Sequence, residues 1–430
     1  MTAGNTLILK EFQTARIGDE WNSSERMISH RKAAWLNLFQ NRTGAKLFDV
    51  YLKKIKSRNW VGSIGIGNKS IEVVPKIDRR DEKGARENLL VMLSRSGLVP
   101  LTEAEIARLA EKKNPLIVAY MNLFVDKLTL EWRRGRIRYY VLQEYNRPFL
   151  RGKLLVGENI KRNFFHRERF YTAFDEFIED NEYSRILKAA LSVCLDQRMS
   201  EAVSRKSRSL MPDFHEVSGV VPEMLDLDNI TISRQFERFR PLLNMAKIIL
   251  RSISPSFGGR GDQVYSLMFD MNKVFERYIA REVRDALRDT DLHSRTQLRS
   301  RHLLTKEGSK KFLLKPDIGI YKGKEIRCLI DTKWKTLQFT QSHKGVSQSD
   351  IYQMYAYGKQ YDAPVTILLY PRCGKQEACI ADYEHIFCDD KGDDNKKLIQ
   401  IRTIDISRSL IYRGERERLR EELRALIIQN

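Results

Sequence analysis

The stretch that decides the fold of the C-terminal part of the chain is KPDIGI at residues 315–320, YKGK at 321–324 and IRCLIDTKWK at 326–335. Apolar residues on both sides of the Lys-Gly-Lys tip predict two short strands joined by a turn, because glycine between charged residues is typical of an exposed hairpin tip. Asp331 and Lys333 lie two residues apart, so their side chains point to the same face of the second strand. Asp317 follows a proline at the entry to the first strand. An aspartate, a second aspartate and a lysine can therefore converge at one end of the hairpin.

Such a cluster predicts metal chemistry. Two neighbouring carboxylates repel each other unless a cation lies between them, and oxygen ligands suit a hard ion such as Mg²⁺, with Mn²⁺ as a substitute. A metal of this kind keeps water molecules that can attack a phosphate. A lysine beside the metal can orient or deprotonate that water, or stabilise the pentacovalent phosphate.

Pro316-Asp317 followed by Asp331-x-Lys333 resembles the PD-(D/E)xK nuclease motif. The resemblance implies a mixed sheet flanked by helices, with Asp317 and Asp331 as metal ligands, a strand carbonyl, that of Thr332, as a further ligand, and Lys333 as the catalytic lysine. Nucleases of this class often take one more ligand from a preceding helix, and in the helical segment 269–280 that residue is Glu276.

A second element follows the hairpin. Gln353 and Tyr357 are spaced i, i+4 in a segment with helical periodicity, so they share one helix face. The pair resembles the QxxxY element of the RecB-like branch, which implies that it positions the catalytic site or the DNA backbone. The alternative is an exposed, charged hairpin beside two ordinary helices.

Composition limits the class of protein. The chain has 430 residues, enough for two or three domains, and 76 Lys and Arg against 56 Asp and Glu give a net charge of +20, which favours a polyanionic partner. No run of eighteen apolar residues predicts a membrane span, and residues 1–5 do not resemble a signal peptide. The five scattered cysteines indicate reduced thiols in a cytoplasmic protein. Cys373 and Cys379 lack the partners that would complete a zinc site.

The order of predicted elements suggests three regions. Residues 1–150 form an N-terminal α+β region, with a hairpin at 60–77 and a helix at 116–132. Residues 151–258 form a helical middle region with one helix at 236–253. A linker at 254–262 leads into the nuclease domain, which comprises residues 259–430. In the last region we predict a helix (264–289), a strand (301–304), the hairpin (312–333), a helix (348–360), strands at 364–370 and 398–406, and a closing helix (413–428). The glycines at 62–67 do not match a nucleotide-binding loop, and no P-loop occurs, so the chain is expected to bind no nucleotide itself.

The segments RPFLRGKL (147–154), FFHRERF (164–170) and the helix at 179–191, together with the strand VVPKI (73–77), resemble the McrC family. McrC is the nuclease subunit of McrBC-type, modification-dependent restriction systems. The resemblance, which spans about residues 60–361, implies an N-terminal half that docks on a McrB-like AAA+ ring and stimulates its GTP hydrolysis, and a C-terminal nuclease domain that cuts modified double-stranded DNA. Residues 133–138 and 161–163 are the basic candidates for the loop that enters the ring.

Two other functions remain open at this point. One is a standalone RecB-like repair or junction nuclease, and the other is an adaptor that stimulates a GTPase without cleaving DNA. The large region before the hairpin favours a docking function over the first. The intact Asp317, Asp331 and Lys333 argue against the second, because a buried acid cluster is costly without a metal.

Overall fold

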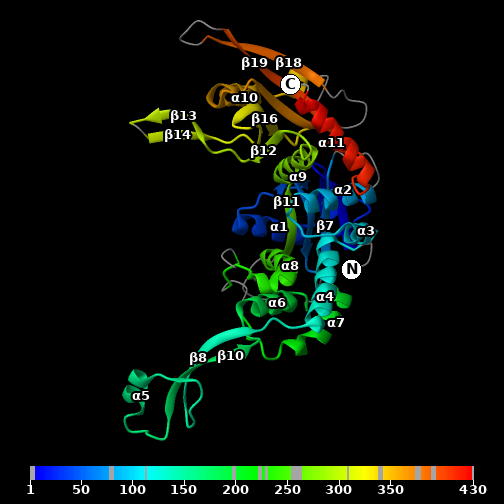
Figure 1. The fold of residues 1–430 in the computed structure, drawn as a ribbon. Coiled ribbons are helices and arrows are strands. Elements are labelled where there is room, and N and C mark those ends of the chain that lie inside the picture. The colour runs from blue at the N-terminus through cyan, green and yellow to red at the C-terminus, as the bar shows by residue number, and fades with distance from the viewer. Residues whose placement is uncertain are drawn as a thin grey trace. The chain divides into compact units, whose positions relative to one another are not determined.

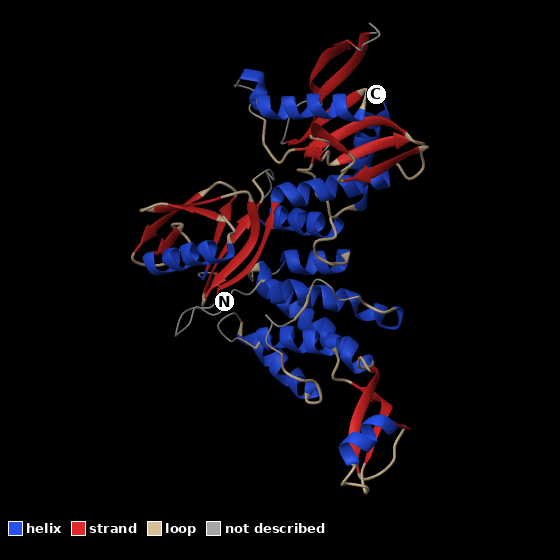
Figure 2. Ribbon diagram, turned by 90° about the vertical axis from the view of Figure 1, so that its left-hand side faces the viewer, coloured by secondary structure: helices blue, strands red, loops and turns tan. Residues whose placement is uncertain are grey.

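The computed structural model describes residues 5–76, 82–111, 114–195, 200–220, 225–227, 231–252, 264–307, 309–337, 342–372, 379–388 and 394–428. The fold is mixed α/β, as predicted, with several separate sheets (Figures 1 and 2). The chain divides into two compact units. We refer to Met1–Leu116 with Ser266–Asn430 as the discontinuous unit and to Ile117–Tyr265 as the inserted unit.

This division does not follow the predicted boundaries at residues 150 and 258. The discontinuous unit is held together by contacts between the two ends of the chain. Strand β11 (Val264–Asp270) completes a four-stranded sheet of order β1-β7-β6-β11, and the Asn59 side chain donates a 2.8 Å hydrogen bond to Asp270. Such pairing is not visible from the order of elements along the sequence, because the paired segments lie about two hundred residues apart. The predicted linker at 254–262 lies outside the described residues.

The N-terminal part of the discontinuous unit contains β1 (Thr6–Lys10), β2 (Thr14–Gly18), β3 (Met27–Ser29), α1 (His30–Thr43), β4 (Phe48–Val50), β5 (Lys54–Ser57), β6 (Trp60–Ile66), β7 (Lys69–Val74), α2 (Glu82–Arg95) and α3 (Glu103–Glu111). The predicted hairpin at 60–77 is confirmed, since β6 and β7 pair antiparallel around Gly67 and Asn68. Gly62 has φ +124°, and a Cβ there would lie 2.0 Å from the carbonyl oxygen of Leu267. Glycine therefore allows β11 to approach β6.

The C-terminal part contains α9 (Met271–Ala286), β12 (Leu292–Thr296), β13 (Arg301–Lys306), β14 (Ser309–Leu314), β15 (Ile318–Lys322), β16 (Glu325–Thr332), η5 (Ser342–Gly345), α10 (Gln348–Tyr361), β17 (Val365–Arg372), β18 (Cys379–Cys388), β19 (Asp394–Asp405) and α11 (Arg413–Ile428). Six strands form one sheet in the order β12-β15-β16-β17-β19-β18. The pairs β16–β17 and β17–β19 are parallel, and the other pairs are antiparallel.

The predicted hairpin at 312–333 and helix at 348–360 are confirmed by β15, β16 and α10. One prediction in this part was wrong. The predicted helix at 264–289 begins as β11, and only α9 is helical. The predicted strand at 301–304 exists as β13, but it pairs with β14 in a separate two-stranded ribbon, whose residues are mostly exposed, while β12 occupies the edge of the sheet.

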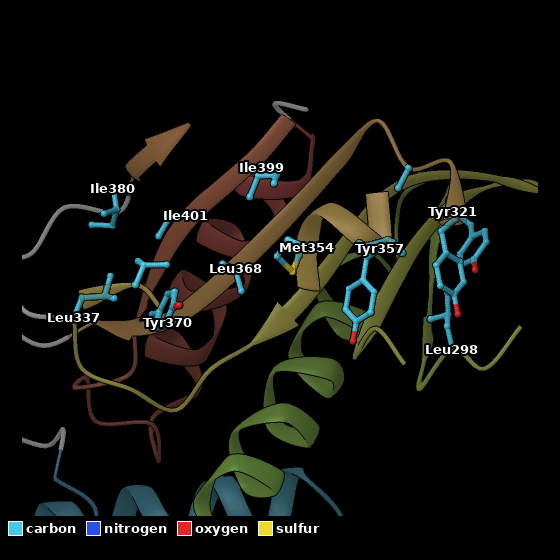
Figure 3. Close-up of a cluster of buried hydrophobic side chains, with 14 residues drawn as sticks. Leu298, Tyr321, Leu337, Met354, Tyr357, Leu368, Tyr370, Ile380, Ile399 and Ile401 are labelled. Carbon is cyan, nitrogen blue, oxygen red and sulfur yellow. The ribbon is translucent and has the colours of Figure 1, made fainter. Parts of the chain in front are cut away.

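Helix α10 covers one face of this sheet and fixes the end of the hairpin. A hydrophobic core forms where Met354, Tyr357 and Tyr361 of the helix meet Leu329 and Leu368 of the strands (Figure 3). Asp331 lies two residues beyond Leu329 on β16, so its side chain points to the same face. Alternate residues such as Ile330 and Leu369 are equally buried, because α9 packs on β16 and α11 packs on β19. Both faces of the central strands are therefore covered.

The inserted unit contains α4 (Leu116–Arg134), β8 (Tyr139–Arg147), β9 (Lys153–Leu154), α5 (Val156–Asn163), β10 (Phe170–Ile178), α6 (Glu182–Val193), α7 (Glu201–Leu210), η2 (Met211–Phe214), η4 (Arg234–Phe239) and α8 (Arg240–Arg251). Strands β8, β10 and β9 form one antiparallel sheet. The predicted single helix at 236–253 is instead a 3-10 segment followed by α8. Pro241 lies in the first turn of α8, and because proline has no N–H it favours a helix start there.

Candidate active site

The end of the β15–β16 hairpin brings the two predicted aspartates together. Strands β15 and β16 pair antiparallel with Ile318 opposite Ile330, so Asp317 and Asp331, the next residues outward, lie on adjacent chains. The backbone N–H and the hydroxyl of Thr332 both donate 2.8 Å hydrogen bonds to Oδ2 of Asp317. These two bonds fix the orientation of the Asp317 carboxylate. The role predicted for the Thr332 carbonyl stays a prediction.

Asp331 is almost fully buried, with 3% of its surface exposed. Its Oδ2 atom lies 2.7 Å from Nζ of Lys333, which makes an ion pair. The alignment of the two groups is poor, so that among the described residues this buried oxygen receives no hydrogen bond of normal geometry. A buried carboxylate oxygen without a well-aligned donor calls for an explanation, and a bound cation provides one. The residues therefore fit the predicted metal.

Lys333 connects the aspartates to α10. Its Nζ atom donates a 2.9 Å hydrogen bond to Oε1 of Gln353, whose Nε2 donates a 2.6 Å bond to the hydroxyl of Tyr357. The structure thus brings the Gln353–Tyr357 pair into contact with the predicted catalytic lysine. The chain of bonds from Tyr357 through Gln353 fixes the position of the Lys333 ammonium group next to Asp331.

Glu276 lies at the edge of this cluster. It is half-buried on α9 and accepts a hydrogen bond from Nε2 of Gln297, whose backbone N–H donates a 2.8 Å bond to the carbonyl oxygen of Asp317. Within the described parts of the chain, no group of three or more His, Cys, Asp or Glu side chains is arranged to hold a metal ion. Asp317 and Asp331 lie on adjacent strands, and Glu276 lies beside them on α9.

The electrostatics of the cluster follow from burial. Burial and the charge of Asp317 raise the pKa of Asp331 to about 7, although Lys333 acts in the opposite direction. Burial also raises the pKa of Asp317, against the hydrogen bonds from Thr332, and burial together with the charge of Asp317 raises the pKa of Glu276. Three carboxylates with raised pKa values mark a site in which negative charge is costly. A divalent cation would remove that cost.

Burial alone would lower the pKa of Lys333, but the nearby carboxylates of Asp331, Asp350 and Asp317 outweigh it, so the pKa is raised. The side chain is therefore a cation at neutral pH. In this state it can donate hydrogen bonds and offset negative charge, whereas it cannot accept a proton.

Asp350 also belongs to this cluster, although the sequence did not single it out. Lys335 donates a 3.0 Å hydrogen bond to its Oδ2 atom, and Nζ of Lys333 lies 3.6 Å from its Oδ1 atom. Burial would raise the pKa of Asp350, but bonds from Ser347 and Lys335 hold it below its usual range. One signal was present in the sequence: Asp350 precedes Gln353 by three residues and shares its helix face. An acid in the first turn of a helix is ordinarily explained by its interaction with the helix dipole, so Asp350 was not recognised as a candidate site residue.

Other candidate residues have local roles. Trp334 is buried, and its Nε1–H group faces both carboxylate oxygens of Glu11, each 3.0 Å from Nε1. His343 is exposed. Cys194 and Cys328 are buried free thiols, whereas Cys373 lies outside the described residues.

The two basic candidates for a docking loop are partly neutralised within the inserted unit. Arg136 and Arg138 both bind the buried carboxylate of Glu179, and Arg162 pairs with Glu158 at 3.1 Å. These arginines stabilise their own unit. Across the described residues, no helix is long and apolar enough to cross a membrane.

Comparison with known proteins gives consistent matches. The family model described as McrBC 5-methylcytosine restriction system component matches residues 55–371. A chain of the half-complex from a tetradecameric assembly of Thermococcus gammatolerans McrB AAA+ hexamers with bound McrC aligns with a TM-score of 0.71 at 21% identity, over 98% of this chain and 100% of that chain. A chain of the cryo-EM structure of the Thermococcus gammatolerans McrBC complex aligns with a TM-score of 0.52 at 23% identity, over 66% and 88%. No curated protein matches the chain. At these identities the solved structures show similarity of fold.

Proposed function

The chain belongs to the family of McrBC 5-methylcytosine restriction system components, and from this membership we propose that it is the Mg²⁺-dependent DNA endonuclease subunit of such a system. The observation that supports this proposal most strongly is the convergence of Asp317, Asp331 and Lys333 at one end of the β15–β16 hairpin. An acid pair with a fixed lysine at its side suits phosphodiester hydrolysis, in which charge develops on the scissile phosphate.

Asp317 and Asp331 would hold the metal, together with the backbone carbonyl of Thr332. A bound Mg²⁺ would supply an activated water and neutralise charge on the phosphate. The bonds from Thr332 hold Asp317 in place before the metal binds. The buried Oδ2 atom of Asp331 needs a cation, and in this structure the Lys333 ammonium group is the cation nearest to it.

Lys333 would act on the phosphate rather than as a base. Its raised pKa keeps it charged at neutral pH, and Gln353 fixes its Nζ atom by a 2.9 Å hydrogen bond. A charged donor in a fixed position stabilises the negative charge of the pentacovalent phosphate. Gln353 and Tyr357 position the lysine and contact no reacting atom in this arrangement.

We also propose that the chain binds an AAA+ GTPase ring of the McrB type. The fold match with the chain from the Thermococcus gammatolerans assembly of McrB with bound McrC covers nearly all of both chains, which supports a shared architecture. The loops beside the sheet and α5 of the inserted unit expose large apolar side chains, including Phe149 between β8 and β9 and Phe164 and Phe165 after α5, the last with 87% of its surface exposed. Exposed apolar groups on one small element are typical of a protein-binding surface and support docking through this unit.

The proposal is tested by purifying the chain with its GTPase partner and comparing wild type, Asp331→Ala and Lys333→Ala. Both GTP turnover and plasmid cleavage are measured in Mg²⁺. We expect both variants to lose cleavage while stimulating GTP turnover as wild type does, because the cluster lies in the discontinuous unit and the exposed apolar surface in the inserted unit.

Other results would favour the alternatives. Variants that cut like wild type would refute the nuclease site. Cleavage by the chain alone, with no effect of the chain on GTP turnover, would favour a standalone nuclease. Stimulation of GTP turnover without cleavage by wild type would favour the non-cleaving adaptor.

A further inference from the structure

A groove with a volume of about 590 Å³ lies beside the candidate site, wholly within the discontinuous unit. Glu276 and Gln297 line it. Gln297 also donates hydrogen bonds to the Glu276 side chain and to the backbone carbonyl of Asp317. Gln297 therefore links the groove to Asp317 of the candidate site. We call this surface the basic groove.

Helix α9 supplies one wall of the basic groove with four cations: Lys273, Arg277, Arg281 and Arg284. Their spacing of four, four and three residues places them on one face of the helix. Two cations come from outside this helix: Arg299, which follows β12, and Arg95 of α2, which pairs with Glu282 and Asp285. The four cations of α9 and Arg299 belong to exposed residues. The basic groove thus combines a row of exposed cations along one helix with a further exposed cation beside it.

Most of these charges form neither a hydrogen bond nor an ion pair with the described residues. Arg281 pairs with Asp285 at 3.3 Å, whereas the side chains of Lys273, Arg277, Arg284 and Arg299 make no such contact there, although Lys273 and Arg277 act to lower the pKa of Glu276. Like charges spaced i, i+4 on a helix repel each other. An external anion beside α9 would relieve this repulsion.

A neighbouring cavity shows that this chain neutralises arginines elsewhere. The cavity, of about 650 Å³, lies between α9 and α11 and is also rich in arginine. There Arg420 binds the fully buried Glu282 at 2.8 Å, Arg413 pairs with Glu417 at 3.2 Å, and Arg416 pairs with Glu103. Those arginines are paired with acids, whereas Lys273, Arg277, Arg284 and Arg299 of the basic groove form no ion pair with the described residues.

We propose that the basic groove binds the phosphate backbone of the DNA strand flanking the scissile bond, with Arg277, Arg284 and Arg299 contacting phosphates. The proposal rests on the proposed endonuclease function and assigns the surface on which its substrate lies. A row of cations matches a ligand with regularly spaced negative charges, and contacts to phosphate position DNA without reading its sequence. This surface would orient any duplex across the Asp317–Asp331 pair.

The test measures binding apart from cleavage. The full chain is titrated against a fluorescent 30-base-pair duplex in EDTA, and anisotropy is followed between about 50 and 300 mM KCl. The variants are Arg277→Gln, Arg284→Gln and Arg299→Gln. Arg327→Gln is the matched control, because Arg327 is exposed on β16 in the same unit and does not line the basic groove. Thermal melting confirms that each variant is folded.

Each variant of the basic groove is expected to weaken binding by about 3- to 10-fold at 100 mM salt and to reduce the slope of log Kd against log salt by about 0.9, as loss of one phosphate contact requires. The control is expected to change binding less than about twofold. Binding equal to that of the control would overturn the proposal, and so would absence of duplex binding by wild type at low salt. The proposal would also fail if polyglutamate of matching charge bound as tightly and lost the same affinity in the variants, because the groove would then bind an acidic protein.

Asp331→Asn separates this proposal from the proposed function. If Asp331→Asn binds duplex DNA like wild type but does not cut it, both proposals stand. If it still cuts while the basic-groove variants lose binding, the catalytic assignment fails and the basic groove remains the DNA-binding surface.

Discussion

Nζ of Lys333 lies 2.7 Å from Oδ2 of Asp331, and the same ammonium group donates a hydrogen bond to Gln353. The lysine therefore offsets the charge of the buried carboxylate. A divalent cation that binds Asp331 would take over this charge, and Lys333 would keep Gln353 and Asp350 as partners.

Asp331→Asn is predicted to stabilise the protein at pH 8 in EDTA while abolishing cleavage. The folded-state pKa of Asp331 is raised to about 7 from its usual value of 3.8, so the folded state loses stability as the pH rises from about 3.8 to about 7, with no further loss above that range. Asparagine removes that cost, which we estimate at about 1–3 kcal/mol after discounting for the coupling with Lys333. Thermal melting at pH 5 and pH 8 checks this: the gain should be small at pH 5 and clear at pH 8. A variant less stable than wild type at pH 8 would contradict the prediction.

Metal affinity is predicted to rise with pH. Carboxylate ligands bind a metal in their deprotonated form, and Asp331 carries a proton in a growing fraction of molecules as the pH falls below about 7. If Mn²⁺ binding releases one proton from Asp331, the apparent affinity falls roughly tenfold for each pH unit below the pKa of this group. Isothermal titration calorimetry of the full chain with Mn²⁺ at pH 6 and at pH 8 should show this loss. Equal affinities at the two pH values would show that Asp331 is not a titrating ligand.

Gln353→Ala is predicted to lower the rate of cleavage by about 10- to 100-fold without weakening DNA binding, because it removes the acceptor that fixes Lys333. Gln353→Glu should restore part of the rate, since it keeps an acceptor oxygen. Gln348→Ala is the control, as Gln348 lies on the same helix but is exposed and bonds to the Tyr352 hydroxyl. Single-turnover cleavage and duplex binding are measured together. An equal effect of both alanine variants on the rate would contradict a positioning role.

Trp334→Phe is predicted to destabilise the protein by about 1–3 kcal/mol, because it removes the indole donor that contacts both oxygens of the buried Glu11 carboxylate. Burial already raises the pKa of Glu11 to about 7, so a lost donor makes its ionised form still more costly. Combining Trp334→Phe with Glu11→Leu should recover part of the loss, since neither polar partner is then left alone. Chemical denaturation of the four proteins in this cycle measures the coupling. Additive effects would show that the contact contributes nothing to stability.

The local parts of the site were predictable from sequence. Alternation of apolar residues placed Asp331 and Lys333 on one face of β16, and helical spacing placed Gln353 and Tyr357 together on α10. Asp350 was missed because its partner Lys335 reaches it from another element, which only the packing of α10 on the sheet reveals.

The non-local parts of the fold were not predictable. The apolar run that forms β11 fits a strand or a buried helix, and its pairing with β6 decides between them. The same pairing makes one unit of the two ends of the chain, an arrangement that the order of elements along the sequence does not reveal. Charge spacing on α9 was visible in the sequence, but the arginines that pair with its acid Glu282 come from α2 and α11, which only the packing of the helices reveals.

We propose that Asp317 and Asp331 hold the metal ion required for DNA cleavage. Asp317→Asn tests it most directly, because asparagine keeps an oxygen that can accept both hydrogen bonds from Thr332 while losing the negative charge. The measurement is plasmid cleavage in Mg²⁺ and GTP by the chain with its GTPase partner. We predict that Asp317→Asn stimulates GTP turnover as wild type does and cuts at least about a thousandfold more slowly. Cleavage within about threefold of wild type would contradict the claim.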